Sequence, residues 1–335
     1  ALLIADEPTT ALDVIVQRQI VELLRETIKD LGTSLLFISH DLALVSSITE
    51  KIIVMRNGEI VESGDTSAVW QSPQHAYTKQ LWDATPTLRV EPRPPLHVRR
   101  PDEESSSPDL LRVERLAHSF FWGPRGKVGP FALDDVSISV RKGETLCIVG
   151  ESGSGKSTLA RCVVGMLPPD KGRIIFDGHE LTGNGSKGWR PVRRDIQMVF
   201  QDPYASLNPR MKIIDLVSEG LVINRITSSA AEARSRAIEL LELVGLQASH
   251  GDRYPHQFSG GQRQRIAIAR ALAVRPKLLV CDEPVTSLDV SIRAQIVQLL
   301  IDIQNSEGVA FLFITHDIAL ARQIDDLAAV HDGDT

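Results

Sequence analysis

The sequence predicts an α/β fold in which a mostly parallel β-sheet carries helices on its faces. Apolar stretches of strand length alternate with helical stretches after residue 110, a rhythm typical of parallel sheets. A glycine-rich loop joins one of these strands to a helix at residues 150–157. Residues 1–45 align with residues 277–321 at a constant offset of 276 and without a gap. We therefore expect two related α/β units in tandem.

The first unit is assigned to residues 1–85. It opens with an apolar strand and an acidic turn, and a helix is expected over residues 14–29. A second apolar strand ends at His40. Residues 52–61 predict a short hairpin that turns at Asn57-Gly58, because this dipeptide is a strong signal for a two-residue turn.

A linker and a second unit follow. Prolines, charges and a run of serines alternate in residues 86–109, so this stretch is expected to be a semi-extended linker without a core. The second unit is assigned to residues 110–335. Its strands are expected at residues 111–116, 136–140, 145–149 and 277–281, with a helix over residues 158–167. Residues 202–246 break the alternation and predict an inserted helical subdomain.

The repeat indicates that the first unit lacks its front. Three short matches carry the alignment, namely Asp6-Glu7 with Asp282-Glu283, Leu12-Asp13 with Leu288-Asp289, and His40 with His316. The offset places the start of the first unit about 166 residues before Ala1. The second unit is expected to be clipped at its end, near Asp332-Gly333. We therefore expect the chain to be a piece of a longer protein.

Composition excludes several classes of function. The chain has 335 residues, a net charge of −6 and 42% hydrophobic residues, which is ordinary for a globular protein. No nucleic-acid partner is expected, since such proteins usually carry a basic surplus. The apolar runs are far shorter than the roughly 20 residues of a membrane-spanning helix. The three cysteines are expected to be buried and unpaired, because their spacing fits neither disulfides nor a metal cluster.

The loop at residues 150–157 is the main candidate site. Its pattern is Gly-x-x-x-x-Gly-Lys-Ser between a strand and a helix, in which backbone N–H groups cradle phosphate oxygens, the lysine adds a charge and the serine can ligate Mg²⁺. An ordinary glycine-rich turn would leave Lys156 unexplained. The expected nucleotide contacts are Gly150, Glu151, Ser152, Gly153, Ser154, Gly155, Lys156, Ser157 and Thr158.

Two carboxylates and a histidine form a second candidate group. Asp282 and Glu283 follow an apolar strand, at the end of the sheet where ligands bind in open α/β folds. Adjacent strand residues point to opposite sides, so Asp282 is predicted to hold the metal and Glu283 to polarise the attacking water. His316 and His40 each lie 33 residues after the glutamate of their own unit. This recurrence favours a γ-phosphate contact over a purely structural histidine.

Residues 259–262 predict a second anion site. Ser259-Gly260-Gly261-Gln262 stands at the start of an amphipathic helix that is expected to end near Val274, and helix N-termini attract anions. Taken alone, an ordinary capped helix start would explain this segment equally well.

These motifs together resemble the ATP-binding cassette family. The resemblance covers essentially all of residues 110–335 and, through the repeat, residues 1–85. It implies a phosphate-loop nucleoside triphosphatase cassette with an antiparallel β subdomain and an inserted helical subdomain. It further implies that two cassettes pair head to tail, so that the residues 259–262 signature acts on the ATP of the partner cassette.

The resemblance also implies roles for individual residues. Expected catalytic residues are Glu283, His316, Gln201 and Lys156, and the expected Mg²⁺ ligands are Ser157, Gln201 and Asp282. The adenine-stacking aromatic falls at Phe120, and its neighbours Phe121 and Trp122 are alternatives. The first unit has no phosphate loop, no glutamine equivalent and no signature. Asp6, Glu7, Asp13 and His40 are therefore expected to belong to a site whose other half is absent.

Two segments are similar to the peptide-importer branch of this family. They are residues 200–210 and residues 73–81, and two cassettes in one chain resemble glutathione and microcin-type peptide importers. This implies an ATPase, peripheral on the cytoplasmic face of the inner or plasma membrane, that works with permease subunits and a solute-binding protein. The short proline-rich linker argues against a soluble cassette ATPase acting on ribosomes or DNA. The paired glutamates and histidines argue against a binding module without catalysis.

Overall fold

The structure is a computed structural model. It describes residues 1–9, 14–39, 42–56, 58–84, 109–120, 130–151, 153–183, 186–286, 288, 290–317, 320–321, 324 and 327–330. The chain divides into two compact units, residues 1–91 with residues 287–295 and residues 92–286 with residues 296–335. Residues 86–108 of the expected linker lie outside the described residues.

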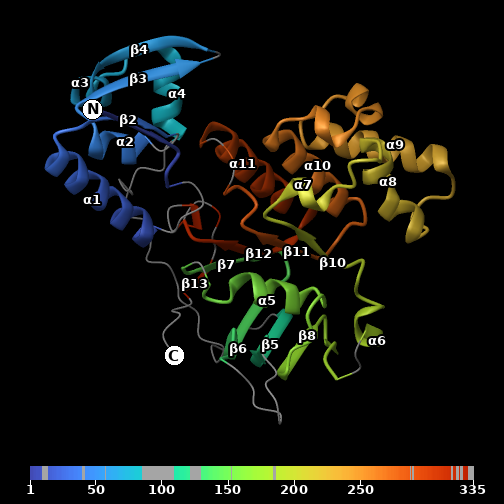
Figure 1. The fold of residues 1–335 in the computed structure, drawn as a ribbon. Coiled ribbons are helices and arrows are strands. Elements are labelled where there is room, and N and C mark those ends of the chain that lie inside the picture. Colours follow the sequence, from blue (N-terminus) through green and yellow to red (C-terminus); the bar gives the residue numbers. More distant parts are fainter. Residues whose placement is uncertain are drawn as a thin grey trace. The chain divides into compact units, whose positions relative to one another are not determined.

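The larger unit is built on a five-stranded parallel sheet (Figure 1). In spatial order its strands are β10 (Ile196–Val199), β11 (Leu278–Asp282), β12 (Ala310–Thr315), β7 (Thr145–Val149) and β13 (Leu327–Val330). Every residue of β7, β11 and β12 is buried, because helices or a second sheet cover both faces. This burial explains the continuous apolar runs, and the architecture confirms the predicted α/β fold class.

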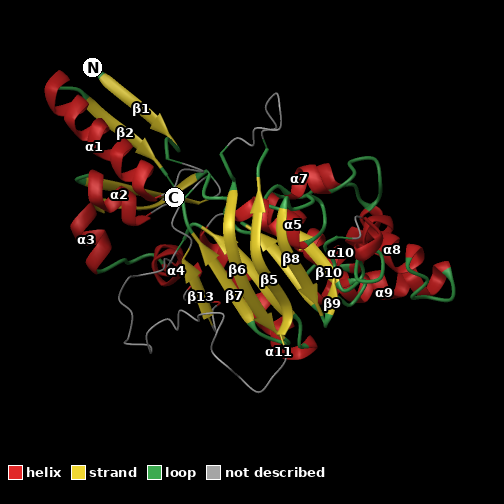
Figure 2. Ribbon diagram, turned by 90° about the horizontal axis from the view of Figure 1, so that it is seen from below, coloured by secondary structure: helices red, strands yellow, loops and turns green. Residues whose placement is uncertain are grey.

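A second, antiparallel sheet covers one side of this unit. Its strands, in order, are β6 (Leu133–Arg141), β5 (Asp109–His118), β8 (Lys171–Phe176) and β9 (His179–Glu180), and Figure 2 shows the first three side by side. Helix α5 (Lys156–Val163) lies between the two sheets (Figure 1), and one apolar cluster joins its residues to both. The helix that follows the phosphate loop is therefore held on two sides.

The inserted helical subdomain is present, in yellow and orange in Figure 1. It consists of α7 (Pro203–Ser206), α8 (Ile213–Ile223), α9 (Ala230–Leu243), the 3₁₀ turns η2 (Ala248–Asp252) and η3 (Pro255–Gln257), and α10 (Gly260–Leu272). Helix α9 begins at an N-cap serine, Ser229, whose Oγ accepts the Glu232 N–H. Elsewhere in the chain lie α6 (Ser186–Trp189) and α11 (Val290–Glu307).

The smaller unit contains a two-stranded parallel sheet and a hairpin. Its elements are β1 (Leu2–Asp6), α1 (Val14–Leu31), β2 (Ser34–Ile38), α2 (Leu42–Ile48), β3 (Lys51–Arg56), β4 (Glu59–Asp65), α3 (Thr66–Gln71) and α4 (Ala76–Ala84). Strand β1 pairs with β2 in parallel, and β3 pairs with β4 antiparallel. The predicted helix and hairpin are both present, although Asn57 of the turn lies outside the described residues.

The helix after the phosphate loop ends earlier than the sequence predicts. We expected it to run to residue 167, where two prolines follow, but α5 ends at Val163. Gly165 adopts a φ of 73°, and a side chain there would collide with the ring of Trp189. A glycine with positive φ just past the last turn is a common helix terminator. The tight approach of Trp189 fixes the end of the helix at this point.

Cys147, Cys162 and Cys281 are buried, as expected, and none of them forms a disulfide. Burial raises the pKa of the Cys162 thiol to about 12. Within the described ranges, no helix combines the length and the apolar character needed to cross a bilayer.

Candidate functional site

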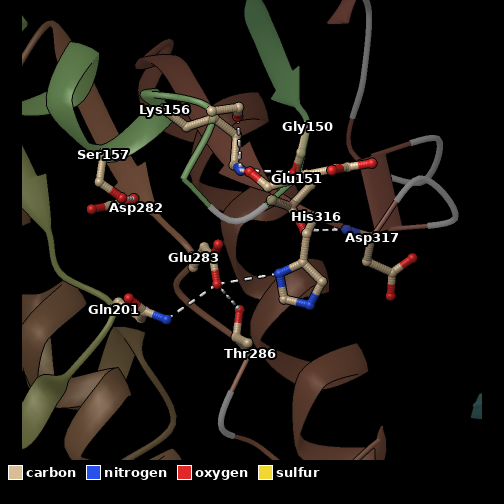
Figure 3. A network of polar contacts seen from close by, with 12 residues as sticks. Gly150, Glu151, Lys156, Ser157, Gln201, Asp282, Glu283, Thr286, His316 and Asp317 are labelled. Atoms are coloured by element: carbon tan, nitrogen blue, oxygen red, sulfur yellow. Dashed lines mark hydrogen bonds and ion pairs between the residues drawn. The ribbon is translucent and has the colours of Figure 1, made fainter. Parts of the chain in front are cut away.

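The candidate site is assembled from the carboxyl ends of four neighbouring parallel strands. Strand β7 leads into Gly150, β11 into Asp282 and Glu283, β12 into His316, and β10 into Gln201. These strands are consecutive in the sheet, in the order β10, β11, β12, β7. Ligands of open α/β sheets bind at this edge. The topology thus brings together four segments that lie far apart in the sequence (Figure 3).

The phosphate loop needs glycine where the sequence places it. Gly153 and Gly155 have φ values of 89° and 92°, in the left-handed region. A side chain at Gly155 would also clash with the backbone carbonyl oxygen of Ala132, which lies just before β6. The loop is therefore shaped by its own backbone and by the arm that precedes β6. Ser152 lies outside the described residues.

Lys156 is the first residue of α5, and its side chain folds back over the loop. Its Nζ donates to the carbonyl oxygens of Gly150 at 2.7 Å and Glu151 at 2.6 Å, and lies 3.4 Å from the Ser154 Oγ. The residue is only 4% exposed. A buried ammonium needs such oxygen partners because desolvating a charge is costly. Phosphate oxygens would offer the same kind of partner with full negative charge.

Ser157 and Asp282 connect the loop to strand β11. The Ser157 hydroxyl donates to Asp282 Oδ1 at 2.9 Å, and Asp282 is 3% exposed. Burial, the largest influence, raises the pKa of Asp282; the Ser157 hydrogen bond opposes the increase and the charge of Glu283 adds to it. A cation at this place would relieve the cost of the buried carboxylate. Thr158 is buried in the next position of the helix.

Glu283 is separated from Asp282 by a turn rather than by strand alternation. We expected the two acids to diverge because adjacent strand residues face opposite ways. However, β11 ends at Asp282, and Glu283 has a φ of 46°. Its N–H donates to the carbonyl oxygen of Ile314 on β12 at 3.0 Å. The two carboxylates therefore diverge because of the turn and not because of strand alternation, and their separate roles stay a prediction.

The Glu283 carboxylate collects three contacts on its Oε2 (Figure 3). Gln201 Nε2 donates at 3.2 Å and Thr286 Oγ1 at 3.0 Å, and His316 Nδ1 lies at 3.3 Å. Burial on its own would raise the pKa of Glu283. The hydrogen bond and charge of His316, followed by the Thr286 hydrogen bond, outweigh burial, so this pKa is lowered. The carboxylate is consequently held ionised.

The predicted signature has only local contacts. Ser259 is the N-cap of α10: its Oγ accepts the Gln262 N–H at 3.3 Å, and its own N–H donates to Gln262 Oε1 at 3.1 Å. This reciprocal pair is a capping box. Ser259 and Gly260 are exposed, whereas Gly261 is buried. An exposed helix N-terminus stands here, and none of these contacts reaches the phosphate loop.

Phe120 lies just beyond the end of β5, and its side chain is 56% exposed. The neighbouring aromatics Phe121 and Trp122 lie outside the described residues. A large exposed aromatic at a strand end provides a flat apolar surface, which suits stacking on a base.

The expected residues of the first unit are only partly described. Asp6 ends β1, and Glu7 follows with a φ of 45°. The Glu7 N–H donates to the carbonyl oxygen of Ile38 at 2.9 Å. Asp13 and His40 lie outside the described residues.

Thr286 is a site residue that our sequence reasoning missed. It holds the Glu283 carboxylate from three positions further along the chain. The internal repeat carried a signal for it, because the matching position is Thr10. Comparing the two units residue by residue beyond the acidic pair would have identified it.

Comparison with protein families agrees with this geometry. Residues 133–286 match the family model described as ABC transporter. The chain belongs to the ATP-binding cassette transporter family. The resemblance inferred from the motifs is thereby confirmed, and the matched range runs from β6 through the acidic turn of the cassette.

Individual relatives are similar over nearly the whole chain. The glutathione import ATP-binding protein GsiA of Escherichia coli O6:H1 is 43% identical over 350 residues, which is 98% of this chain and 56% of that protein. GsiA of Salmonella paratyphi A is 41% identical over the same shares. The chain thus spans about half the length of these relatives.

Solved cassette structures share the fold of this cassette. A dimeric post-hydrolysis state of the ATP-binding cassette MJ0796 bound to ADP and Pi has 31% identity and a TM-score of 0.61, and covers 67% of this chain and 94% of that chain. CbiO1 from Clostridium perfringens, part of the transporter complex cbiONQ, has 32% identity and a TM-score of 0.59, with 67% and 85% covered.

Proposed function

We propose that the cassette at residues 110–335 binds ATP at its phosphate loop and hydrolyses it when paired with a second cassette. The observation that carries this proposal is the convergence of Lys156, the Ser157–Asp282 pair and the ionised Glu283 at one edge of the sheet. A cation, a hydroxyl–carboxylate pair and a carboxylate are the groups that phosphoryl transfer to water requires.

The phosphate oxygens of ATP would replace the carbonyl oxygens that now accept hydrogen bonds from Lys156. Lys156 exchanges its carbonyl contacts for β- and γ-phosphate oxygens, which gains charge-assisted hydrogen bonds. The backbone N–H groups at the start of α5 add further donors. The base stacks on Phe120, whose ring is exposed for it.

The residues present fit a magnesium ion. Ser157 and Asp282 offer a hydroxyl and a carboxylate within 2.9 Å of each other, and Gln201 offers an amide oxygen. Magnesium prefers oxygen ligands and uses few protein groups beside water and substrate phosphates. When bound, the ion would neutralise phosphate charge.

Glu283 is placed to polarise the attacking water. All three of its contacts with described residues fall on Oε2, which leaves Oε1 for the water. The lowered pKa keeps the carboxylate ionised at neutral pH, the state in which it can accept a hydrogen bond from the water. His316 engages Glu283 through Nδ1, so its Nε2 is the ring nitrogen available to a γ-phosphate oxygen.

The signature completes the site of a partner cassette. Ser259 and Gly260 present an exposed helix N-terminus, which attracts anions, and the capping-box contacts there do not involve the phosphate loop of its own cassette. The solved relative MJ0796 is a dimer with ADP and Pi. Pairing of two cassettes, each supplying a signature to the other, would use both features.

The proposed biological role is to power import of peptides or related small solutes. Its support is the printed function of the relatives, glutathione import, and the similarity to the peptide-importer branch in the sequence. The whole protein would then work with permease subunits and a solute-binding protein, at the cytoplasmic face of the inner or plasma membrane. Neither the comparisons nor the fold favours a role on ribosomes or DNA.

The test combines three variants with two measurements. Lys156→Ala should abolish ATP binding, measured by calorimetry with Mg²⁺. Glu283→Gln should keep ATP binding but lose phosphate release, measured at high chain concentration so that cassettes can pair. Ser259→Glu, which adds a negative charge to the signature, should leave ATP binding intact and reduce phosphate release. Undiminished phosphate release in Glu283→Gln would refute the assignment of the base.

A further inference from the structure

His118 is a buried histidine that the proposed reaction does not use. It ends β5, two positions before Phe120, and is 7% exposed. Among the described residues, neither of its ring nitrogens has a hydrogen-bond partner. Its Nδ1 lies 3.8 Å from Asp170 Oδ2, and its ring meets the Phe120 ring edge to face, with centroids 4.8 Å apart and planes at 90°. An unpartnered polar ring is costly to bury, so its place requires an explanation.

Asp170 fixes the same strand end from the other side. It stands in the turn that follows α5 and precedes β8. Its N–H donates to the Ala117 carbonyl oxygen at 2.8 Å, and its Oδ2 accepts the Ser119 N–H at 2.7 Å. Ser119 is 1% exposed. The segment between Ala117 and Phe120 is therefore held by the turn that leaves α5.

A second connection joins this segment to the phosphate loop. The carbonyl oxygen of His118 accepts the Ala132 N–H at 2.8 Å, and the carbonyl oxygen of Ala132 fills the space where Gly155 lacks a side chain. The segment that carries Phe120 is thus connected to the chain on either side of α5. Ala132 links it to Gly155 just before the helix, and Asp170 links it to the turn after the helix.

We propose that His118, which packs beside Asp170, is a positioning residue that sets the Phe120 ring as the stacking surface for the nucleotide base. This inference rests on the proposed function, in which Phe120 meets the base. Phe120 is 56% exposed, and the His118 ring packed against it edge to face restricts its rotamers. An aromatic that is already oriented loses less entropy on stacking. His118 touches no reacting atom, so it affects ATP affinity and not the hydrolytic step.

Tripolyphosphate carries the phosphates of ATP without the base. Calorimetry with each ligand in the presence of Mg²⁺ therefore distinguishes the contribution of the base to binding from that of the phosphates. We expect His118→Leu to weaken ATP binding about tenfold, because base–aromatic stacking is worth 5-fold or more, and to leave tripolyphosphate binding within about twofold. His118→Phe, which retains a ring for the edge contact, should recover most of the ATP affinity. Asp170→Asn keeps an acceptor for the Ser119 N–H but loses the charge near His118. Its ATP affinity should lie between those of His118→Leu and His118→Phe.

The Phe120→Ala variant provides the matched control. Phe120→Ala should lower the affinity for ATP as much as His118→Leu does and leave the affinity for tripolyphosphate unchanged. The double variant should bind ATP no more weakly than Phe120→Ala, because His118 acts through Phe120. Equal weakening of ATP and tripolyphosphate by His118→Leu, or no weakening of either, would overturn the inference. If the wild-type chain bound neither ligand, the proposed function would be overturned, and this inference with it. The same holds if the Lys156→Ala variant bound ATP as well as the wild-type chain.

Discussion

The two acidic strand ends of this chain have the same local geometry and different surroundings. Glu7 and Glu283 have φ values of 45° and 46°, and each N–H donates to the carbonyl oxygen of an isoleucine in the neighbouring strand, at 2.9 and 3.0 Å. Yet Leu2 is 60% exposed whereas its counterpart Leu278 is 0% exposed. A short segment is therefore enough to form the turn. The burial of Leu278 depends in addition on β10 and β7, which flank the pair formed by β11 and β12.

The difference in neighbouring strands indicates which of the two units carries a complete candidate site. Strand β11 lies between β10 and β12, and β12 lies beside β7, which carries the phosphate loop. Strands β1 and β2 form a sheet of two strands, so within the described residues no third strand brings a lysine or a glutamine to Asp6 and Glu7. A repeated motif is therefore a complete site only where neighbouring strands supply the remaining groups. Matched substitutions in the two units test this dependence.

The largest contrast is expected for the two glutamates. Glu283→Gln should lower the rate of phosphate release by about 100-fold or more, the usual contribution of a general base. Glu7→Gln should leave the activity of this chain within twofold, because residues 1–85 contain no phosphate-loop pattern. Steady-state release of phosphate at several chain concentrations measures both. An equal loss in the two variants would show that Glu7 also serves a working site.

A large difference in stability is expected for two equivalent leucines. Leu312 is 0% exposed in β12, and Leu36 is 45% exposed at the matching position of β2. Leu312→Ala should reduce the free energy of unfolding by about 2–5 kcal/mol, the usual cost of a core cavity. Leu36→Ala should cost less than about 1 kcal/mol. Urea unfolding followed by circular dichroism checks this, and similar costs would contradict the assigned burial.

A smaller effect of opposite sign is expected at Asp282. Its pKa is raised chiefly by burial, so the ionised form is disfavoured in the folded state. Asp282→Asn should stabilise the protein without nucleotide or Mg²⁺ by on the order of 1 kcal/mol at neutral pH. A carboxyl group with a raised folded pKa costs stability above that pKa and none below its unfolded value. The gain should therefore shrink as the pH falls towards 4.

Thermal unfolding between pH 4 and pH 8 measures this gain. Asp6→Asn, in the exposed equivalent position, is the matched control and should change little at any pH. Asp282→Asn should also weaken the Mg²⁺ dependence of ATP binding. A gain that grew towards low pH would contradict the raised pKa.

The smallest effect is expected for Thr286→Ala. It removes one of three contacts to the Glu283 carboxylate, and a single hydrogen bond contributes about 0.5–1.5 kcal/mol. Phosphate release should fall about threefold with ATP affinity unchanged. Thr286→Ser, which retains the hydroxyl, should restore the rate. Thr10→Ala, the matching change in the first unit, should have no effect on this chain.

Much of the fold and part of the site followed from the sequence because they depend on local patterns. The boundaries of β7, the helical insertion and the glycine requirement of the phosphate loop are written in short stretches of apolar residues and glycines. The early end of α5 was missed because it depends on Trp189, a contact from a distant segment. The orientation of Glu283 was explained incorrectly, since its positive φ comes from the turn after β11. The role of His118 required three-dimensional contacts with Asp170 and Phe120.

The enclosure of α5 between two sheets has a consequence for motion. A helix packed on two sides resists displacement, because shifting it would open gaps in both interfaces at once. We therefore expect the phosphate end of the cassette to be its least mobile part. The chain leaves the core for the helical insertion near residues 200–203 and returns to it near residues 273–277. Gln201 stands at the first of these crossings, so we expect any movement of the insertion to shift the residue that donates to Glu283.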